Sequence, residues 1–576
     1  MKSSNENVKT IGLIHEDIFT DFAKEIIHSV VHASIGRKDI NIIVIAGRQD
    51  DSSDPLDRLH QYKSVYNSIY DLENMVKFDG LIVTLPNTNI VSRYKNFQEI
   101  PKVYVAADVP GETAVNYNDE MGIRETIDYL VKVCGYTKLC MLGGRDENAD
   151  AQKRKRIFIQ CLEENGLEYS EKQYEKSNMS VKSEAASLRL LNRNPDVQAI
   201  FCVNDQSAVG LYEVMKRRGL TPGREIKVFG FDNTRMAGEM VPSLSSIGPD
   251  SATLGQTALE LLLAKLAGNE VNSVEIPTRL FGRGSLDYEM YEYTTKEMLN
   301  VDTAFIYRMF DDCLYRYKSE IIDRGAIDLR RLFFEFLSKM LIAMKNRVMS
   351  DEQYKEIAQL IDIFFENGAM KYTDANKFLK SVDHLQHAMN SSQRSIYVNS
   401  KNNRLFARMK DKAIQSQAIA RRMETKGYNL GRENIFEFNI QTTGLEAANA
   451  DSVDNVIANY NRLGFTNSAL YMFEDPVIYE MNKKVRFPST LKLKCVVRSR
   501  ELHIIPNEKQ ETPVENIFMR EELPASPKGY TAYPVFCGKY IFGVVVTAME
   551  RQLLDKGEYI TFQLGRAFYM NWAWDQ

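Results

Sequence analysis

Short apolar segments alternate with amphipathic helical segments over the first half of the chain. The apolar runs, rich in Val, Ile and Leu, are TIGLIHE (10–16), INIIVIAG (40–47), DGLIVTLP (79–86), PKVYVAAD (101–108), KLCMLGG (138–144), AIFCVND (199–205) and IKVFGFD (226–232). Stretches of helical period, such as 120–133 and 208–217, separate most of them. Continuous apolar strands joined by helices are typical of parallel sheets covered on both faces. The pattern therefore predicts a doubly wound α/β architecture.

Several of the predicted strands end in polar pairs: His15-Glu16, Asn204-Asp205 and Asp232-Asn233. Ligands of such sheets bind outside the carboxyl ends of the strands, where loops and helix N-termini present polar groups. These ends therefore predict a binding site. The alternative is that each residue is a helix N-cap or turn former, since Asp and Asn favour both positions.

Spaced motifs in this half resemble a known family. They are DGLIV at 79, Asn118-Asp119 with Gly122, DYLVKVCGYTKLCMLGG, AIFCVNDQSAVG, RRGLTPGREIKVFGFDN, PSLSSI and LGQTALELLLAKLAG. In this order they resemble the ligand-binding core of the lactose/galactose-repressor family and of periplasmic sugar-binding proteins. The resemblance covers residues 9–286 and implies two lobes joined by a hinge that close on a small molecule. The expected first lobe is about 9–107 and 248–275, and the second about 108–247 and 276–286.

The resemblance also implies ligand contacts. Asp232 is expected to accept hydrogen bonds from ligand hydroxyls, Asn204 to contribute from the preceding strand end, and Arg154 to donate. A planar arginine facing carboxylate and amide acceptors suits a polyol. Phe19 or Phe22 is expected to place a ring against the C–H side of a sugar, unless both are core residues. The candidate ligand-binding residues are His15, Phe19, Phe22, Arg154, Asn204, Asp205 and Asp232.

The sequence departs from the family at three positions. An acid-base pair often follows the fourth strand of sugar binders, but Ala106 and Ala107 stand here, and a further expected polar contact falls on Ile247. These residues indicate either a less polar ligand or a partly degenerate pocket. Only eight residues precede Lys9, so we expect no N-terminal helix-turn-helix.

Helical periodicity dominates residues 287–435, which we predict to be an α-helical bundle or connector. Ser350 and Gln353 have capping-box spacing, and Asn367-Gly368 ends the same helix. His384 and His387 share a helix face but have no partner segment rich in Glu or Cys, so no metal is expected. The basic run 404–423 is interpreted as a packed amphipathic helix, with nucleic-acid contact as the alternative.

Residues 436–576 read as a mixed sheet backed by helices, with a hairpin around Gly538-Lys539. We predict an α+β domain that weakly resembles the GAF class. The order of sugar-binding-like core, helices and YPVFCGKYIFGVVV resembles the sensory part of bacterial signalling proteins that continue into a diguanylate cyclase. No GGDEF signature occurs in the chain.

Composition narrows the function classes. The 576 residues predict three or four domains, and the 44% hydrophobic and 26% charged residues are typical of a soluble globular protein. A net charge of -4 gives no reason to expect nucleic acid or an anionic membrane. No signal peptide or membrane span is seen in the sequence, and the seven cysteines are never spaced CxxC, so we expect a cytoplasmic protein.

These observations predict a ligand-sensing regulatory protein that binds a sugar-like metabolite without a cofactor. Its expected partners are a second copy of the chain and a separate output protein, with no membrane and no DNA contact through an N-terminal reader. The alternatives are an interaction scaffold with a degenerate pocket and an enzyme. The chain lacks the GxSxG, P-loop, HExxH and GxGxxG motifs, so we expect no enzymatic activity.

Overall fold

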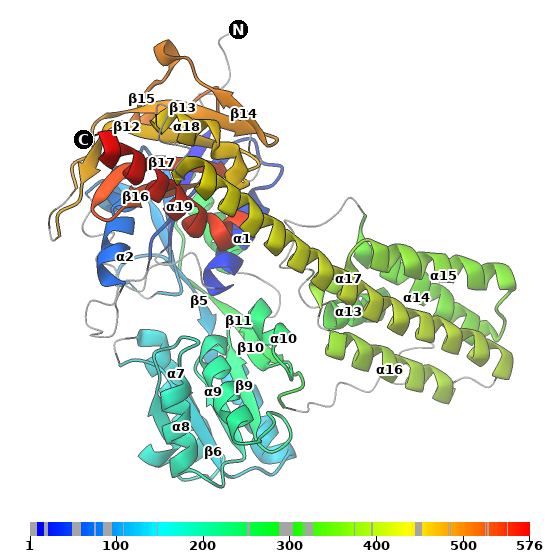
Figure 1. Ribbon diagram of the computed structural model, residues 1–576. Helices are drawn as coiled ribbons and strands as arrows, with labels where there is room; N and C mark the ends of the chain where they lie inside the picture. Colours follow the sequence, from blue (N-terminus) through cyan, green and yellow to red (C-terminus); the bar gives the residue numbers. More distant parts are fainter. Residues whose placement is uncertain are drawn as a thin grey trace. The chain divides into compact units, whose positions relative to one another are not determined.

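Figure 1 shows the computed structural model of the chain. Its residues form two compact units. One unit contains residues 1–116, 254–274 and 424–576, and the other contains residues 117–253 and 275–423. The structure describes residues 8–575 apart from 16–20, 49–58, 74–75, 85–94, 108, 147, 250–253, 287–302, 315–316, 318–326, 374, 393–394, 444–451, 482, 484, 525, 527–528 and 550.

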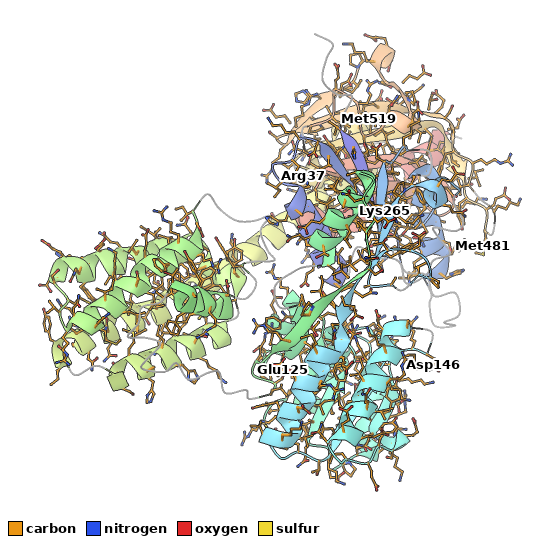
Figure 2. The ribbon with its side chains drawn as sticks, turned by 180° about the vertical axis from the view of Figure 1, so that it is seen from behind. Arg37, Glu125, Asp146, Lys265, Met481 and Met519 are labelled. Atoms are coloured by element: carbon orange, nitrogen blue, oxygen red, sulfur yellow. The ribbon has the colours of Figure 1, made fainter. Side chains whose placement is uncertain are left out.

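The first lobe is built on a parallel sheet of the order β2-β1-β3-β4-β5. Its strands are β1 (Lys9–His15), β2 (Ile40–Ala46), β3 (Gly80–Thr84), β4 (Lys102–Val105) and β5 (Ala114–Asn118). Helices α1 (Asp21–Ser34) and α11 (Leu254–Leu266) pack against each other, and α11 also packs on β3 and β4. Lys265 of α11, labelled in Figure 2, donates a hydrogen bond to the carbonyl of Lys102 at 3.2 Å. The parallel pairing of β1 with β2 and β3, and of β3 with β4, confirms the parallel strands predicted in this lobe.

The C-terminal part of the same unit is an antiparallel sheet of the order β14-β13-β12-β17-β16, with β15 also beside β13. Its strands are β12 (Ser468–Ile478), β13 (Thr490–Arg498), β14 (Glu501–Ile504), β15 (Glu511–Pro513), β16 (Tyr530–Cys537) and β17 (Tyr540–Ala548). The end of α17 (Ile396–Thr443), α18 (Ser452–Ala458) and α19 (Arg551–Asp575) share one hydrophobic core with this sheet. The predicted hairpin at Gly538-Lys539 is confirmed as the turn between β16 and β17.

This C-terminal sheet is joined to the first lobe. Tyr530 and Thr531 of β16 pair in parallel with Ile43 and Val44 of β2, so the two sheets are continuous. Gly529 precedes the pairing with a φ of 89°, and a Cβ there would lie 2.2 Å from the carbonyl oxygen of Ile42. Only glycine permits both the backbone angle and this approach.

Side chains from both parts also share one hydrophobic core. The rings of Tyr62 in α2 (His60–Tyr66) and Phe536 in β16 lie 5.2 Å apart, and that of Tyr66 lies 6.3 Å from Phe536. Residues 9–286 and 436–576 were predicted to be separate domains. In the structure a strand of the second of these covers an edge strand of the first lobe.

The second unit contains the second lobe, a sheet of the order β7-β6-β8-β9-β10-β11 in which only the β10–β11 pair is antiparallel. Its strands are β6 (Leu139–Gly143), β7 (Tyr174–Lys176), β8 (Ala199–Cys202), β9 (Lys227–Phe231), β10 (Ser245–Pro249) and β11 (Val274–Phe281). Buried residues of α6 (Asp119–Asp128) and α7 (Ala149–Glu164) form one core with the sheet. Those of α8 (Glu184–Arg193) and α9 (Asp205–Arg217) form another. Helices on both faces confirm the predicted architecture.

Helices from 303 onward form a core of their own in the same unit. They are α13 (Thr303–Cys313), α14 (Leu329–Asn346), α15 (Asp351–Glu366), α16 (Ala375–Ser392) and the first part of α17. The capping box of Ser350 and Gln353 is confirmed. The basic run 404–423 lies in α17, where Arg408 pairs with Asp362 and Leu405 is buried, which favours the packed helix over nucleic-acid contact.

No helix in the described part of the chain is both long and apolar enough to cross a membrane. Within the same residues, no group of three or more His, Cys, Asp or Glu side chains could hold a metal ion, and His384 and His387 belong to no such group.

We predict that Phe536→Ala destabilises the first lobe together with the C-terminal sheet, because the ring belongs to their shared core. The expected loss is about 3–5 kcal/mol in the free energy of unfolding. Hydrogen exchange measures it locally, and amides of both β1 and β17 should exchange faster. Phe364→Ala, a matched truncation in the helical core, should leave these amides unchanged. Faster exchange in β17 alone would show that the two parts are independent.

Candidate ligand-binding site

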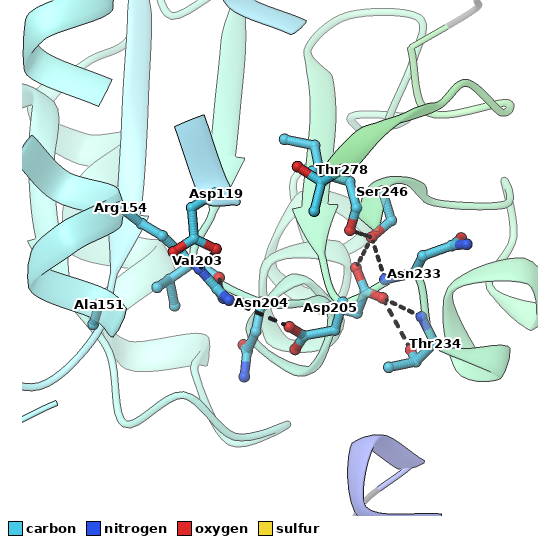
Figure 3. A network of polar contacts seen from close by, with 12 residues as sticks. Asp119, Ala151, Arg154, Val203, Asn204, Asp205, Asn233, Thr234, Ser246 and Thr278 are labelled. Atoms are coloured by element: carbon cyan, nitrogen blue, oxygen red, sulfur yellow. Dashed lines mark hydrogen bonds and ion pairs between the residues drawn. The ribbon is translucent and has the colours of Figure 1, made fainter. Parts of the chain in front are cut away.

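Polar side chains of the second unit gather where three strands, β5, β8 and β9, end (Figure 3). Asp119 follows β5 and begins α6, Asn204 and Asp205 follow β8 and begin α9, and Asp232 follows β9. Arg154 reaches the same cluster from α7. The carboxyl ends of strands are where doubly wound sheets bind ligands.

Arg154 is the centre of the cluster. Its side chain is only 6% exposed, and its guanidinium lies 3.6 Å from the centre of the Phe231 ring. Nη1 donates to the carbonyl of Val203 at 2.7 Å, and Nε lies 3.4 Å from Oδ1 of Asp119. Burial opposes the charge, but the two nearby aspartates outweigh it and raise the pKa of Arg154. The side chain is therefore a fixed cation.

Asp232 faces this cation without a normal hydrogen bond. Its Oδ1 lies 3.6 Å from Nη2 of Arg154, beyond ordinary hydrogen-bond length. The side chain is 14% exposed, more than either Arg154 or Asp119. Burial raises the pKa of Asp232 to about 6, although Arg154 acts in the opposite direction. The carboxylate thus keeps acceptor capacity for another group.

Asn204 and Asp205 have structural partners within the lobe. The amide oxygen of Asn204 caps α9 by accepting from the Ser207 backbone at 3.0 Å, and its nitrogen donates to the carbonyl of Met179. Asp205 is fully buried and accepts from the Ser246 hydroxyl at 2.6 Å and from the Thr234 backbone at 2.8 Å. For Asn204 this arrangement corresponds to the N-cap alternative. The ligand contacts expected of Asn204 and Asp205 stay predictions.

Asp205 contacts the turn that follows β9. Asp205 satisfies the first backbone and hydroxyl donors of Thr234, so its carboxylate supports the loop that carries Asp232. Burial and the neighbouring charge of Asp232 raise its pKa to about 7. Asp205 is therefore a residue that holds the site in place.

The remaining predicted residues belong to the first lobe. His15 ends β1 and is buried, and burial lowers its pKa to about 3, so it is neutral at ordinary pH. Phe22 lies in α1 and is half-buried. Phe19 lies outside the described residues.

Two departures from the family pattern have different outcomes. Ile247 is fully buried in the second-lobe core, where a Cβ added to Gly122 would lie 2.3 Å from its Cγ2. Its apolar character serves packing, so it says nothing about ligand polarity. Ala106 is partly exposed with a φ of 53°, and Ala107 packs against the first-lobe core.

Sequence reasoning did not assign Asp119 to the site. Its carboxylate is nearly buried and pairs with Arg154 and with Lys153, whose Nζ lies 3.6 Å away. The signal was present, because Asn118-Asp119 repeats the Asn-Asp pair of 204–205 and Asn118 also caps a helix. In both dipeptides the asparagine ends a strand region and caps the helix that begins at the aspartate.

Comparison with known proteins finds relatives of this part of the chain. Residues 127–286 match the periplasmic binding protein-like domain family. The chain is 26% identical over 206 residues to the lactose operon repressor of Escherichia coli, covering 35% of this chain and 56% of that protein. It is 23% identical over 263 residues to the transcriptional repressor PurR of Aliivibrio salmonicida, covering 45% and 75%.

A third relative is the probable transcriptional repressor ExuR of Bacillus subtilis, 27% identical over 219 residues, covering 36% of this chain and 63% of that protein. The chain thus spans little more than half the length of some of these relatives. Among solved structures, the regulator CelR in complex with cellobiose has a TM-score of 0.41 at 19% identity, covering 48% of this chain and 85% of that one.

These findings show that residues 127–286, which include most of the second lobe, are similar to a periplasmic-binding-protein-like domain. Its relatives are transcriptional repressors and regulators, not enzymes, in agreement with the prediction. The resemblance to the repressor core is confirmed for this domain by the family match and the relatives.

We predict that Asp205 makes stability depend on pH. Its folded pKa of about 7 exceeds its ordinary value of 3.8, so the folded state binds a proton that the unfolded chain loses first. The resulting stabilisation is complete below about pH 4 and is lost as pH rises through about 7.

Urea unfolding of wild type and Asp205→Asn at pH 5, 6 and 7 tests this. The difference in the free energy of unfolding should shrink as pH rises. Asp196→Asn, an exposed acid of the same lobe, provides the control. A constant difference across the three pH values would contradict the raised pKa.

Proposed function

We propose that the protein is a ligand-sensing regulator that binds a sugar-like metabolite through Arg154 and Asp232. The observation that carries the proposal is a pair of opposite charges 3.6 Å apart near the strand ends, in which Arg154 is buried and Asp232 is 14% exposed. At 3.6 Å, Arg154 and Asp232 are too far apart for a normal hydrogen bond to each other. A ligand hydroxyl can accept a hydrogen bond from Arg154 and donate one to Asp232. A polyol supplies such hydroxyls.

The surroundings of the pair support a specific contact. The Phe231 ring holds the guanidinium plane, and Val203 and Asp119 occupy other edges of it. A preorganised cation loses little freedom when a ligand binds. We propose that Asn204 and Asp205 act indirectly, by fixing the start of α9 and the turn after β9.

The regulatory part of the proposal draws on the relatives. The lactose operon repressor and PurR are repressors by name, so control of gene expression or signalling in response to a metabolite is the function that they support. We propose that the protein works as a cytoplasmic homodimer. We also propose that residues 287–435 connect the sensor to a GAF-like domain at 436–576 and that a separate protein provides the output.

One observation favours a second function, an interaction scaffold with a degenerate pocket. Ala106 and Ala107 stand where sugar binders often have an acid-base pair, which removes polar contacts from the first lobe. Ile247 no longer supports this alternative, since it is a core residue.

Thermal unfolding tests the proposed function directly. We predict that one compound among pentoses, hexoses, sugar phosphates and nucleosides stabilises the wild type, by about 2.7 kcal/mol at a hundredfold excess over its Kd. Asp232→Asn, which keeps the shape and removes the charge, should lose this shift, whereas Asp196→Asn should keep it. A panel without any shift would favour the scaffold.

Binding should also depend on pH. Because the pKa of Asp232 is about 6, its carboxylate is ionised above that pH and can accept from ligand hydroxyls. We predict that affinity falls below pH 6, by about tenfold per pH unit at low pH. Calorimetric titration between pH 5 and 8 measures the profile. A flat profile for wild type would mean that the ionised carboxylate does not bind the ligand.

A further inference from the structure

A second buried arginine supports the turn that carries Asp232. Arg283 follows β11 and is 4% exposed. Its Nη1 donates to the carbonyl of Leu244 at 2.6 Å, and its Nη2 donates to Oδ1 of Asn233. Its backbone N–H donates to the Ser245 hydroxyl at 2.7 Å. The Arg283 side chain thus connects the segment after β11 to Asn233, the residue next to Asp232.

The turn it holds has an unfavourable backbone. Asp232 and Asn233 have φ values of 96° and 50°, which residues other than glycine seldom adopt. Such conformations persist only where surrounding contacts determine them.

The described contacts around the turn come from the neighbouring strand β10 and from Arg283. The Asp232 N–H donates to the carbonyl of Ile247 at 2.8 Å, and the Asn233 N–H donates to the Ser246 hydroxyl at 2.9 Å. A Cβ on Gly248 would lie 2.3 Å from Cβ of Asn233, so the neighbouring strand leaves room for this side chain. Arg283, which belongs neither to the turn nor to β10, donates to the Asn233 side chain.

We propose that Arg283 is a positioning residue, which orients the Asp232 carboxylate through Asn233 and links the ligand turn to residues 283–285. The inference rests on the proposed function and deepens it. The fork of arginine is needed because its two acceptors, the Leu244 carbonyl and the Asn233 amide oxygen, belong to different segments. A lysine keeps the charge and cannot present two planar donors to both.

The segment 283–285 is well placed to respond to the turn. The Ser285 hydroxyl donates to the Val228 carbonyl at 2.5 Å and accepts from the Ser245 N–H at 2.7 Å. It is therefore hydrogen-bonded to both β9 and β10. The Val228 N–H also donates to the carbonyl of Ser285 at 3.0 Å. In chain order, the helical region comes next. A ligand that shifts Asp232 therefore acts on the last residues of the lobe before that region.

Arg283→Lys tests the inference in the full chain. Hydrogen exchange without ligand should become faster at the Asp232 and Asn233 amides, and not in β8. Affinity for the panel compound that gives the largest thermal shift should fall about tenfold, which is about 1.4 kcal/mol. Arg218→Lys, an exposed arginine of the same lobe that donates to Asn192, is the matched control and should change neither quantity.

A double-mutant cycle separates positioning from general destabilisation. Asn233→Gly removes the acceptor and relaxes the backbone without altering Arg283, and it replaces Arg283→Lys as the test variant if the lysine variant misfolds. If the contact carries the effect, the double variant binds no more weakly than the weaker single variant. Additive losses of affinity would overturn the inference.

The outcomes also distinguish the inference from the proposed function. Unchanged exchange at the turn, or unchanged affinity in Arg283→Lys, overturns the inference while wild-type binding still stands. A wild type that binds no compound of the panel overturns the proposed function and, with it, the role of Arg283 in ligand binding.

Discussion

A guanidinium group removed from water requires opposite charge close by, and Arg154 obtains it from two carboxylates that are far apart in the sequence. Leaving a buried charge without its partner destabilises a protein by several kcal/mol, so the positions of Asp119 and Asp232 relative to Arg154 are strongly constrained. Through them the starts of α6 and α7 and the end of β9 are tied together by charge as well as by the shared hydrophobic core. The geometry of the candidate site is a consequence of this requirement.

Two kinds of polar contact follow from it. Asn204 and Asp205 have close hydrogen-bond partners within the lobe, and a ligand that displaced those partners would gain little from the exchange. Asp232 instead faces a cation at a distance too long for a direct hydrogen bond, and it retains some exposure. Under the proposed function, Asp232 is therefore the residue that has acceptor capacity for a ligand, while Asp205 and Arg283 hydrogen-bond to Thr234 and Asn233 beside it.

Local sequence predicted the features that depend on local physics. The strands β1 to β4, β6, β8 and β9, the capping box at Ser350 and the hairpin at Gly538 follow from periodicity, capping and turn chemistry, whereas β5, β7, β10 and β11 were not predicted. The proximity of Arg154 to Asp232 came from a family resemblance, because a helix and a strand end about eighty residues apart carry no local sign of contact. Whether Asp205 pointed inward was equally hidden, since both orientations suit a helix N-terminus. The pairing of β16 with β2 was missed because nothing near either strand specifies a partner so distant in sequence.

That pairing changes how a ligand signal is to be understood. The first lobe shares a sheet and a core with the C-terminal part, while the second lobe belongs to the same compact unit as the helices from 303 to 423. Helix α17 runs without interruption from one unit into the other. Under the proposed function, a ligand that favours one arrangement of the lobes can shift the protein only by its difference in affinity between arrangements. Each lobe shares its compact unit with a different part of the second half of the chain, and α17 contributes residues to both units.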